Sequence, residues 1–559
     1  MAHLLTLHDP ATAREHYLSG TWQTDTLYSL ARRHATERGH AYAVRDSMRR
    51  LTWSALVAWV DAVAANLHQA GLRPGDRVAV WLPNRLENVV VLLACSRNGY
   101  VCNPSLHQNY TVAEIRALLQ RIDCRALFAQ PGWGADAGSA DVFAKAAELG
   151  PLKRIFALPP LHTPDAALPQ GAHAMPLAVQ EVRVPLPPAS THPDQIVYLA
   201  FTSGTTGTPK GVMHSDNTLL ANARAMVADW GQNHDTVLLT LSPMSHHIGT
   251  VALDQVLMAG AELVMHDPSA GVAPLDWIET TGATYVMGVP THAMDLLAEV
   301  DRRGSTRLGK VSVFYMAGAP IPTETASRLL VLGARPQNVY GMTENGSHQY
   351  TMPTDPVEVI TSTCGKACSG YEVRLWNPEN PDLEAAPGTV GEIGSRGGLL
   401  MLGYFNNQVA TESSFNSSGW FLSGDLGRFD VNGNLAIVGR KKDLIIRGGH
   451  NIHPAHIEEY AHRHPAVKKA AAFGVPDERL GEKVCLAIIC HGQPPEADNI
   501  LEHLAREGLS KFDMPEYFAV LPEFPLTASG KILKRELVEW VKGGRLQAEP
   551  VRYCAPVTA

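Results

Sequence analysis

The stretch Thr202-Ser203-Gly204-Thr205-Thr206-Gly207-Thr208-Pro209-Lys210-Gly211 decides how the rest of this chain is interpreted. It follows an apolar run, residues 196–201, that predicts a short buried strand. Glycines let the backbone approach a ligand closely, hydroxyl side chains add hydrogen-bond donors, and the lysine supplies a positive charge. The stretch therefore predicts a phosphate-binding loop. It is not a Walker A loop, because a proline precedes the lysine and a glycine follows it.

Length and composition set the broad class of protein. A chain of 559 residues is too long for one ordinary core, so we expect several domains. With 45% hydrophobic and 18% charged residues the composition is typical of a globular enzyme, and a net charge of -8 predicts no nucleic-acid partner. The eight scattered cysteines form no CxxC pair and indicate reduced thiols in a cytoplasmic protein. No apolar run approaches the roughly 18 residues of a transmembrane segment.

The pattern outside the loop predicts the fold class. Residues 77–82 read as a strand and residues 87–95 as a buried helix, within a region of alternating helix and strand patterns. Such alternation favours an α/β fold with a parallel sheet covered by helices. Residues 388–404, which include Met401-Leu402-Gly403-Tyr404, indicate a small β-subdomain.

The phosphate-binding stretch resembles that of the adenylate-forming superfamily, which includes acyl-CoA synthetases, peptide-synthetase adenylation domains and firefly-type luciferases. The resemblance implies a large N-terminal domain of βα-layered sheets with a small β-subdomain, residues 1–441. A small mobile α+β domain, residues 442–559, is implied to follow and to carry the catalytic lysine. The loop residues implied to bind ATP or AMP are Thr202, Ser203, Gly204, Thr205, Thr206, Gly207 and Lys210, and Thr205 is also expected to act in catalysis.

The segment Asn338-Val339-Tyr340-Gly341-Met342-Thr343-Glu344 contains the Tyr-Gly-x-Thr-Glu motif of the superfamily intact. An aromatic ring can lie against adenine, a glycine allows close approach, and a threonine hydroxyl can meet phosphate. Mg²⁺ needs only one or two carboxylates besides phosphate oxygens and water, so Glu344 is predicted to be both metal ligand and catalytic residue. The residues of this segment predicted to bind nucleotide are Asn338, Tyr340, Gly341, Met342 and Thr343.

Later motifs carry the remaining parts that the resemblance implies. Asp425, within Ser423-Gly424-Asp425, matches the aspartate that accepts hydrogen bonds from both ribose hydroxyls. Arg440 matches a ribose and phosphate ligand, and Lys442 matches the hinge between the domains. Gly448 and Gly449 are implied to line the CoA channel. Lys531, on a Ser-Gly turn, matches the lysine that bridges carboxylate and α-phosphate and also binds the nucleotide.

The acyl pocket is predicted around Ser245-His246-His247, because His246 matches a family histidine that lines it. Gly318 and Ala319 are implied to face adenine and the pocket rim. Adaptable methionines favour a cyclic, aromatic or medium-chain acid over acetate. His450, His453, His462 and His464 do not predict a metal site, because no cysteine or clustered carboxylate accompanies them. The predicted pocket residues are His246, His247, Gly249, Met287, Gly288, Met316, Gly318 and Met342.

Together these motifs predict an AMP-forming carboxylic acid:CoA ligase that uses ATP, Mg²⁺ and CoA, and a homodimer is the oligomeric state to test. An enzyme that loads a carrier-protein thiol is the main alternative, although Ser245-His246-His247 stands where a peptide-synthetase version would place an aspartate. A luciferase-like oxygenase has no support in the sequence. A nucleotide-sensing or scaffold protein is disfavoured by the intact Lys210, Glu344, Asp425 and Lys531.

Overall fold

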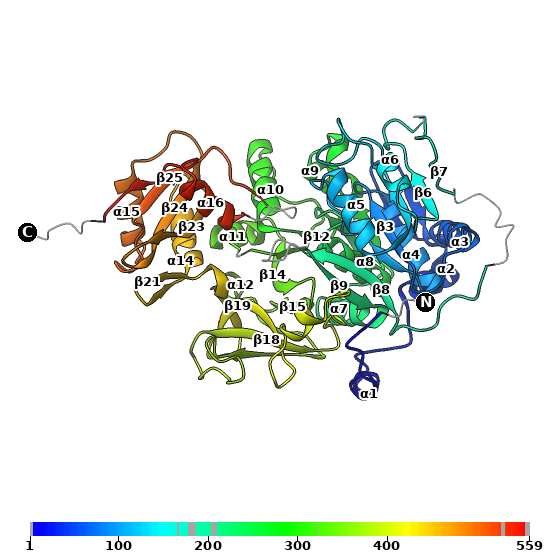
Figure 1. Ribbon diagram of the computed structural model, residues 1–559, viewed down its shortest axis with the longest axis horizontal. Coiled ribbons are helices and arrows are strands. Elements are labelled where there is room, and N and C mark those ends of the chain that lie inside the picture. The colour runs from blue at the N-terminus through cyan, green and yellow to red at the C-terminus, as the bar shows by residue number, and fades with distance from the viewer. Residues whose placement is uncertain are drawn as a thin grey trace, which may run out of the picture. The chain divides into compact units, whose positions relative to one another are not determined.

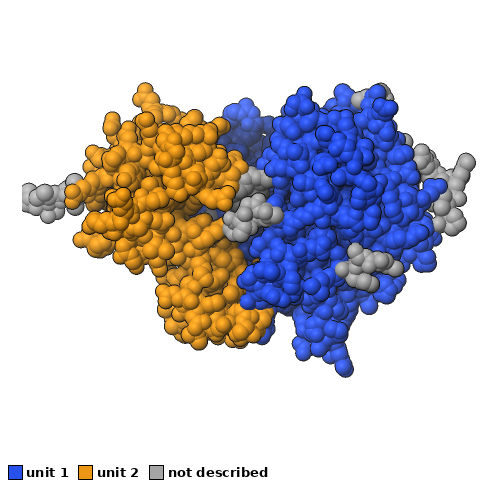
Figure 2. All heavy atoms as spheres, viewed as in Figure 1, with its two compact units in different colours: residues 1–373, 395–415, 433–435 blue, residues 374–394, 416–432, 436–559 orange. Residues whose placement is uncertain are grey.

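The computed structural model describes residues 4–164, 167–176, 186–202, 209–319, 321–526 and 532–553. It divides the chain into two compact units, coloured separately in Figure 2. Unit 1 comprises Met1–Val373, Ser395–Phe415 and Gly433–Leu435, and unit 2 comprises Arg374–Gly394, Asn416–Asn432 and Ala436–Ala559. The division between these compact units falls within a small sheet that precedes residue 441. The predicted boundary between residues 441 and 442 is instead a hinge about which the C-terminal domain would rotate, and it stays a prediction.

Unit 1 is built on two large sheets (Figure 1). The seven-stranded sheet is parallel except for its last pair, which is the hairpin around the phosphate-binding stretch. In spatial order its strands are β7 (His173–Ala174), β6 (Arg154–Ala157), β5 (Cys124–Ala129), β3 (Arg77–Trp81), β4 (Val101–Asn103), β8 (Ile196–Thr202) and β9 (Lys210–Ser215).

The nine-stranded sheet is parallel in its middle and antiparallel at both edges. Its strands in spatial order are β16 (Lys366–Ala367), β15 (Gly346–Tyr350), β14 (Arg335–Met342), β13 (Val313–Ala317), β12 (Tyr285–Gly288), β10 (Val237–Thr240), β11 (Glu262–Met265), β1 (Tyr42–Arg45) and β2 (Arg50–Thr52).

The helices of unit 1 begin and end with local signals. Thr52 caps α3 by accepting the N–H of Ala55, and Thr111 and Glu114 form a capping box on α5. Gly99 ends α4 at φ 68°, a left-handed conformation that glycine adopts without strain. The helices are α1 (Pro10–Leu18), α2 (Leu27–Arg38), α3 (Trp53–Gln69), α4 (Leu86–Asn98), α5 (Val112–Arg121), α6 (Val142–Ala147), α7 (Asp216–Asp229), α8 (His247–Ala259), η1 (Pro268–Ala270), α9 (Pro274–Thr281), α10 (Pro290–Arg303), α11 (Thr323–Val331), α12 (Val357–Ser362) and α13 (Gln408–Glu412).

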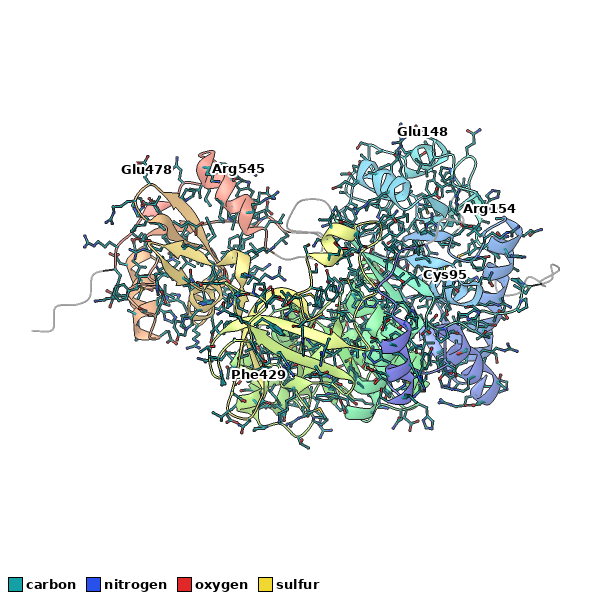
Figure 3. The ribbon with its side chains drawn as sticks, turned by 60° about the horizontal axis from the view of Figure 1, so that its bottom comes forward. Cys95, Glu148, Arg154, Phe429, Glu478 and Arg545 are labelled. Atoms are coloured by element: carbon teal, nitrogen blue, oxygen red, sulfur yellow. The ribbon has the colours of Figure 1, made fainter. Side chains whose placement is uncertain are left out.

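The main core of unit 1 joins both sheets. Tyr198 of the seven-stranded sheet and Met287 of the nine-stranded sheet belong to one buried cluster with side chains of α3, α4 and α8. Cys95, labelled in Figure 3, lies on α4 inside this cluster. A second cluster contains Phe314 and Met316 with side chains of α9, α10 and α11. Helices therefore cover both faces of the nine-stranded sheet, as βα alternation predicts.

A four-stranded sheet and a six-stranded sheet follow. The strands of the smaller sheet, in spatial order, are β17 (Tyr371–Trp376), β18 (Gly391–Gly397), β19 (Phe421–Phe429) and β20 (Leu435–Arg440). The larger sheet runs β22 (His450–Ile452), β21 (Ile445–Arg447), β24 (Gly481–Cys490), β25 (Tyr517–Val520) and β26 (Glu549–Pro550), with β23 (Val467–Asp477) also paired to β24. The helices of unit 2 are η2 (Lys441–Asp443), α14 (Pro454–His462), α15 (Ala497–Arg506) and α16 (Lys534–Lys542).

The six-stranded sheet buries a cluster on each face. Ile457 of α14 and Leu504 of α15 belong to one cluster, and Leu537 of α16 belongs to the other. Figure 1 shows α14, α15 and α16 around β23, β24 and β25. This is the α+β architecture expected for the C-terminal part. Within the described part of the chain, every helix is too short or too polar to cross a lipid bilayer.

The predicted strands over residues 77–82 and 196–201 and the helix over residues 87–95 are confirmed as β3, β8 and α4. One local prediction is wrong. Residues 401–404 do not join the small β-sheet, because Tyr404 bridges to Val212 of β9 in unit 1. Only Gly391–Gly397 of the predicted β-subdomain segment forms a strand there.

Candidate active site

The stretch predicted to bind phosphate begins at the end of the buried strand β8 and finishes in the antiparallel strand β9. Thr202 pairs with Lys210 in the antiparallel register, so these two residues form the base of the loop. Residues 203–208, which carry the other predicted phosphate ligands, lie outside the described residues. Arg121 of α5 holds the end of the loop, since its guanidinium donates to the Pro209 carbonyl and lies 5.4 Å over the Phe201 ring.

The ammonium of Lys210 lies over an aromatic ring. Its Nζ is 4.6 Å from the ring centroid of Tyr404, a residue that is 5% exposed. The Tyr404 hydroxyl donates to Oε1 of Glu344 at 3.0 Å, and Glu344 is itself buried. Burial and the nearby Glu344 carboxylate both raise the pKa of Tyr404, so its hydroxyl stays protonated and donates. The predicted phosphate lysine and metal carboxylate thus contact the same side chain.

Glu344 lies in the tight turn between β14 and β15. Gly341 is required in this turn, because a Cβ there would stand 1.8 Å from the Gly346 carbonyl oxygen. The backbone N–H of Met342 donates to Asn345 Oδ1 at 3.0 Å. Together these contacts fix the path of the chain through Thr343 and Glu344.

A buried histidine fixes the carbonyl of Thr343. Burial lowers the pKa of His214 to about 4, so its imidazole is neutral at physiological pH. His214 Nε2 donates to the Thr343 carbonyl at 2.7 Å, which leaves Nδ1 to accept from the Thr218 hydroxyl at 3.0 Å. Since His214 is on β9, the strand that begins at Lys210 is tied directly to the motif that carries Glu344.

Tyr340 and Asn338 are both buried in β14. The Tyr340 ring packs edge-on against His348, with ring centroids 5.4 Å apart. The Asn338 amide donates to the carbonyls of Ile360 and Thr363, each at 2.9 Å, and so anchors α12 to the sheet. These contacts give Asn338 a role in shaping the strand, and its predicted contact with nucleotide stays a prediction.

The predicted acyl-pocket histidines begin helix α8. His246 is the N-cap residue, and its Nδ1 accepts the N–H of Ile248 at 3.3 Å. His247 Nδ1 lies 3.2 Å from the Tyr198 hydroxyl, and its ring stacks on His214 with centroids 5.7 Å apart. Burial, followed by the neighbouring His214 and His246, lowers the pKa of His247 well below its usual value.

A further histidine adjoins this helix start. His107 Nδ1 lies 3.0 Å from the Ser245 hydroxyl, and its ring centroid is 6.5 Å from that of His246. Burial lowers the pKa of His107 to about 4. The helix can approach residues 243–244 closely because position 249 is glycine. A Cβ there would meet the Pro243 carbonyl oxygen at 2.7 Å.

The other predicted pocket residues do not share one face. The β12–β13 register pairs Met287 with Tyr315 and Gly288 with Met316. Successive side chains of a strand point to opposite faces, and accordingly Met287 belongs to the core beside α8 whereas Met316 belongs to the core beside α10 and α11. The structure therefore does not bring Met287 and Met316 together.

The remaining small residues of the predicted pocket differ in their surroundings. Gly318 and Ala319 are exposed at the carboxyl end of β13, and Gly318 has φ 90°. A Cβ at Gly288 would lie 2.8 Å from His292 Nδ1. Met342 is partly exposed next to the Thr343–Glu344 turn.

In unit 2 the predicted ribose ligand forms an ion pair. Asp425 Oδ1 lies 3.0 Å from Arg440 Nε, and the Asp425 backbone N–H donates to the Ser423 hydroxyl at 3.1 Å. The Asp425 side chain is 8% exposed, whereas that of Arg440 is 42% exposed. The structure thus brings together two residues that the sequence assigned to the same ribose, although they are 15 positions apart in the chain.

The predicted hinge follows at once. Lys441 pairs with Glu392 at 2.8 Å, whereas Lys442 is exposed in the short helix η2. Partial desolvation is the main cause that lowers the pKa of Lys442, and the positive charge of Arg440 adds to it. Gly448 and Gly449 lie in an exposed turn at φ 58° and 84°, and nothing lies within 4 Å of a Cβ built on Gly449.

Lys531 lies outside the described residues, but the ends of its loop are defined. Leu526 bridges to Ile532, and the Leu533 N–H donates to the Pro525 carbonyl at 2.8 Å. Helix α16 begins at Lys534, whose Nζ lies 2.6 Å from Glu458 Oε1. The residues on either side of this segment are therefore paired with each other, and the chain after it continues into a helix.

Comparison with known proteins identifies the whole arrangement. A family model described as AMP-binding enzyme matches residues 31–405, and one described as AMP-binding enzyme C-terminal domain matches residues 456–531. The human mitochondrial medium-chain acyl-CoA ligase is 32% identical over 523 residues, 88% of this chain and 83% of that protein. Feruloyl-CoA synthase of Amycolatopsis sp is 32% identical over 518 residues, 90% of this chain and 97% of that protein.

A solved structure agrees with the family models and with these relatives. The ATP-bound MatB of Rhodopseudomonas palustris superimposes with a TM-score of 0.78 at 28% identity, covering 93% of this chain and 99% of that one. The chain belongs to the AMP-binding enzyme family, the adenylate-forming superfamily that the motifs predict. Within it, the protein is an AMP-forming acyl-CoA synthetase whose substrates are a carboxylic acid, ATP and CoA. The carrier-loading alternative is not favoured.

The structure also places residues near the site that the sequence did not single out for it. Tyr404, His214, Arg121 and His107 each contact a predicted site residue or its loop. Tyr404 lay in a segment that we expected in the small β-sheet. The sequence did contain a signal for His214. It lies four positions after Lys210 on the same strand, β9, and residues at even spacing on a strand share one face.

Proposed function

We propose that Lys210 and the 202–208 loop hold the ATP phosphates, that Glu344 holds Mg²⁺, and that the acid is cyclic, aromatic or medium-chain. The observation that carries this proposal is the contact of both Lys210 and Glu344 with Tyr404 at the ends of strands β9 and β14. A cation and an anion held beside one loop suit a metal–triphosphate complex.

The residues present fit a magnesium ion. Mg²⁺ in nucleotide sites is bound by one or two carboxylates together with phosphate oxygens and water. Glu344 supplies one buried carboxylate, and among the described residues there is no cluster of three or more histidine, cysteine, aspartate or glutamate side chains that would form a protein cage. A bound Mg²⁺ would neutralise phosphate charge.

The adenylation step needs no general base, because the carboxylate is already the nucleophile. In the first step a carboxylate oxygen of the acid forms a bond to the α-phosphorus of ATP, and the bond from this phosphorus to the pyrophosphate oxygen breaks. In the second step the CoA thiol loses its proton to water and its sulfur forms a bond to the acyl carbon. The bond from this carbon to the phosphate oxygen of AMP breaks, and AMP leaves with the electron pair. The protein's task is to neutralise two anions and to position them, which is the proposed work of Lys210 and Lys531.

We assign the unit 2 residues to nucleotide binding and to the change between the two steps. Asp425 accepts the ribose hydroxyls, and its ion pair with Arg440 holds the carboxylate in a fixed orientation. Exposure of Lys442 and positive φ at Gly448 and Gly449 support a turn that can change its backbone conformation. Lys531 serves adenylation, and the Gly449 turn serves attack by the thiol.

The proposed acid class rests on the start of helix α8. His107 and His247 have depressed pKa values and are neutral, so they offer hydrogen bonds without adding a fixed charge. An acid whose single charge is its carboxylate suits such a wall. The names of the relatives, medium-chain acyl-CoA ligase and feruloyl-CoA synthase, support the same class. The free cysteines among the described residues, of which all but Cys490 are buried, support a reducing, cytoplasmic compartment.

Pyrophosphate release across a panel of acids, each with and without CoA, tests the proposal. We expect turnover with medium-chain, benzoic or cinnamic acids, little with acetate, and a strong increase when CoA is added. A preference for acetate or for a dicarboxylic acid would contradict the acid class. A Glu344→Gln variant that keeps its Mg²⁺ dependence would contradict the metal site.

A further inference from the structure

Tyr404 contacts both charged groups of the proposed phosphate and metal site with two different parts of its side chain. The Lys210 ammonium lies over the face of the ring, 4.6 Å from its centroid. The carboxylate of Glu344 accepts from the phenol hydroxyl at 3.0 Å. Tyr404 is 5% exposed and Glu344 is 9% exposed, so the hydrogen bond between them is shielded from bulk water.

The backbone around Tyr404 is tied to both segments that carry these charges. Residues 401–405 run alongside β9 on one side and reach the Glu344 backbone on the other. The hydrogen bonds are Leu402 N–H to Met213 O at 2.8 Å, Met213 N–H to Gly403 O at 3.1 Å, Phe405 N–H to Gly211 O at 2.7 Å and Met401 N–H to Glu344 O at 2.7 Å. Because the main chain is held at both ends, the Tyr404 backbone has a fixed position relative to both β9 and Glu344.

We propose that Tyr404 is a positioning residue that sets the Lys210 ammonium and the Glu344 carboxylate for the magnesium–triphosphate complex before it binds. This inference rests on the proposed roles of those two residues. A lysine and a glutamate that share a small site attract each other, and a direct ion pair would have to break before phosphate and metal could bind. Tyr404 gives each charge a separate partner.

The ring and the hydroxyl of Tyr404 hold the two charged groups in ways that still allow Lys210 to bind phosphate and Glu344 to bind a metal. The ring face holds an ammonium through cation–π attraction and leaves its three N–H groups able to donate. The hydroxyl donates to one carboxylate oxygen, Oε1, and a carboxylate that accepts a hydrogen bond can also ligate a metal. Hydrogen bonds to a ligating carboxylate orient it and tune metal affinity. The ring therefore serves phosphate binding, and the hydroxyl serves metal binding.

Two variants separate these functions. Tyr404→Phe keeps the ring under Lys210 and removes only the hydroxyl, whereas Tyr404→Leu removes both. Calorimetric binding of α,β-methylene-ATP, whose α–β bridge cannot be cleaved, is measured with the full-length chain in EDTA and in saturating Mg²⁺. The ratio of the two affinities is the magnesium enhancement, and the EDTA value reports phosphate binding without metal.

For Tyr404→Phe we expect the magnesium enhancement to fall about tenfold while affinity in EDTA stays within about twofold of wild type. For Tyr404→Leu we expect the same loss of enhancement and, in addition, an affinity in EDTA about fivefold weaker. A purely structural role would weaken both measurements together in both variants. That result, or an unchanged magnesium enhancement in Tyr404→Phe, would overturn the proposal.

Two controls make the result specific. Tyr350 is another buried tyrosine of unit 1, and its hydroxyl also donates to a carboxylate, Asp229 Oδ2, at 2.7 Å. Tyr350→Phe should leave the magnesium enhancement unchanged, which controls for the loss of a buried phenol. Glu344→Gln tests the proposed function by itself. If Glu344→Gln abolishes the enhancement and Tyr404→Phe does not, the role of Tyr404 is wrong while that of Glu344 stands.

Discussion

Unit 1 and unit 2 hold their site residues in different ways. In unit 1, Lys210 and Glu344 are at strand ends, and both contact the buried Tyr404. In unit 2, Arg440 is 42% exposed although it pairs with Asp425, and Gly449 lies in an exposed turn with positive φ. Side chains held by a packed core keep one conformation, whereas side chains on exposed turns can adopt more than one conformation.

This difference agrees with the proposed sequence of two reactions. In the proposed site phosphate and metal are bound in one place, so the groups that meet them gain from being fixed beforehand. Lys531 and the Gly449 turn are each proposed to serve one reaction only, and both belong to unit 2. The comparison therefore predicts that changes in unit 2 affect the two reactions unequally, whereas changes at Lys210 or Glu344 affect nucleotide binding itself.

The largest expected effect comes from Lys531→Ala. Removing the ammonium leaves the carboxylate and the α-phosphate without a shared cation, so adenylation should fall by about 10³-fold. Thioester formation from supplied acyl-AMP should remain within about threefold of wild type, since that step does not use this contact. Rapid-quench assays of each half-reaction provide the measurement. Equal loss of both steps would contradict the division of labour in unit 2.

Gly449→Leu should have the opposite selectivity. A leucine at φ 84° is strained, and its side chain would project into the proposed CoA channel, so we expect thioester formation to fall about 10²-fold with adenylation nearly intact. Gly508→Leu is the matched control, because Gly508 has φ 99° in unit 2 with nothing within 4 Å of its Cβ position. If Gly508→Leu lowers thioester formation as much, backbone strain alone explains the effect.

Much of the fold could be predicted from local patterns. The continuous apolar run before the phosphate loop forms β8, and the motif residues Asp425 and Arg440 meet in one ion pair. Short-range signals suffice where a strand, a turn and a ligand-binding residue follow one another along the chain. The boundary between residues 441 and 442 stays a prediction, because compactness groups most of the small sheet with the C-terminal part of the chain and does not show which part moves.

The parts that sequence could not supply depend on pairing between distant segments. Tyr404 reaches Lys210 and Glu344 only because residues 401–405 hydrogen-bond to β9, which precedes them by almost two hundred positions. Met287 and Met316 looked alike as pocket residues, but the register between β12 and β13 points them to opposite faces. Parallel register is set by tertiary packing and leaves no local signal.

A smaller effect, on stability, is expected at the base of the Lys531 loop. Glu458 is largely buried, and burial raises the pKa of its carboxyl while the Lys534 ammonium at 2.6 Å opposes that rise. When folding raises the pKa of a carboxyl, the free energy of unfolding of the protein falls as pH increases from the pKa in the unfolded state to the pKa in the folded state. Lys534→Met removes the opposing charge, so it should destabilise unit 2 by about 2 kcal/mol at pH 8 and by less at pH 5.

Hydrogen exchange of the full-length chain, followed by mass spectrometry on unit 2 peptides at both pH values, measures this opening free energy. The Ala472 N–H, which donates to Glu458 Oε1 at 2.7 Å, lies in the peptide to follow. Lys542→Met is the control, because its pair with Glu539 on the same helix is exposed and should contribute less than about 0.5 kcal/mol. A loss in Lys534→Met that is larger at pH 5 would contradict the sign derived for Glu458.

The smallest expected effect returns to unit 1 and asks whether its rigidity extends from the nucleotide to the acid. Gly249→Ala places a Cβ 2.7 Å from the Pro243 carbonyl oxygen and 2.8 Å from the Met244 Cα, so the start of α8 must shift. Because His246 caps this helix, we expect the KM for the acid to rise about tenfold while the KM for ATP is unchanged. Steady-state kinetics with each substrate varied in turn decides the matter. An equal rise for ATP would mean that α8 and the phosphate site move as one body, through the contact of His247 with His214 on β9.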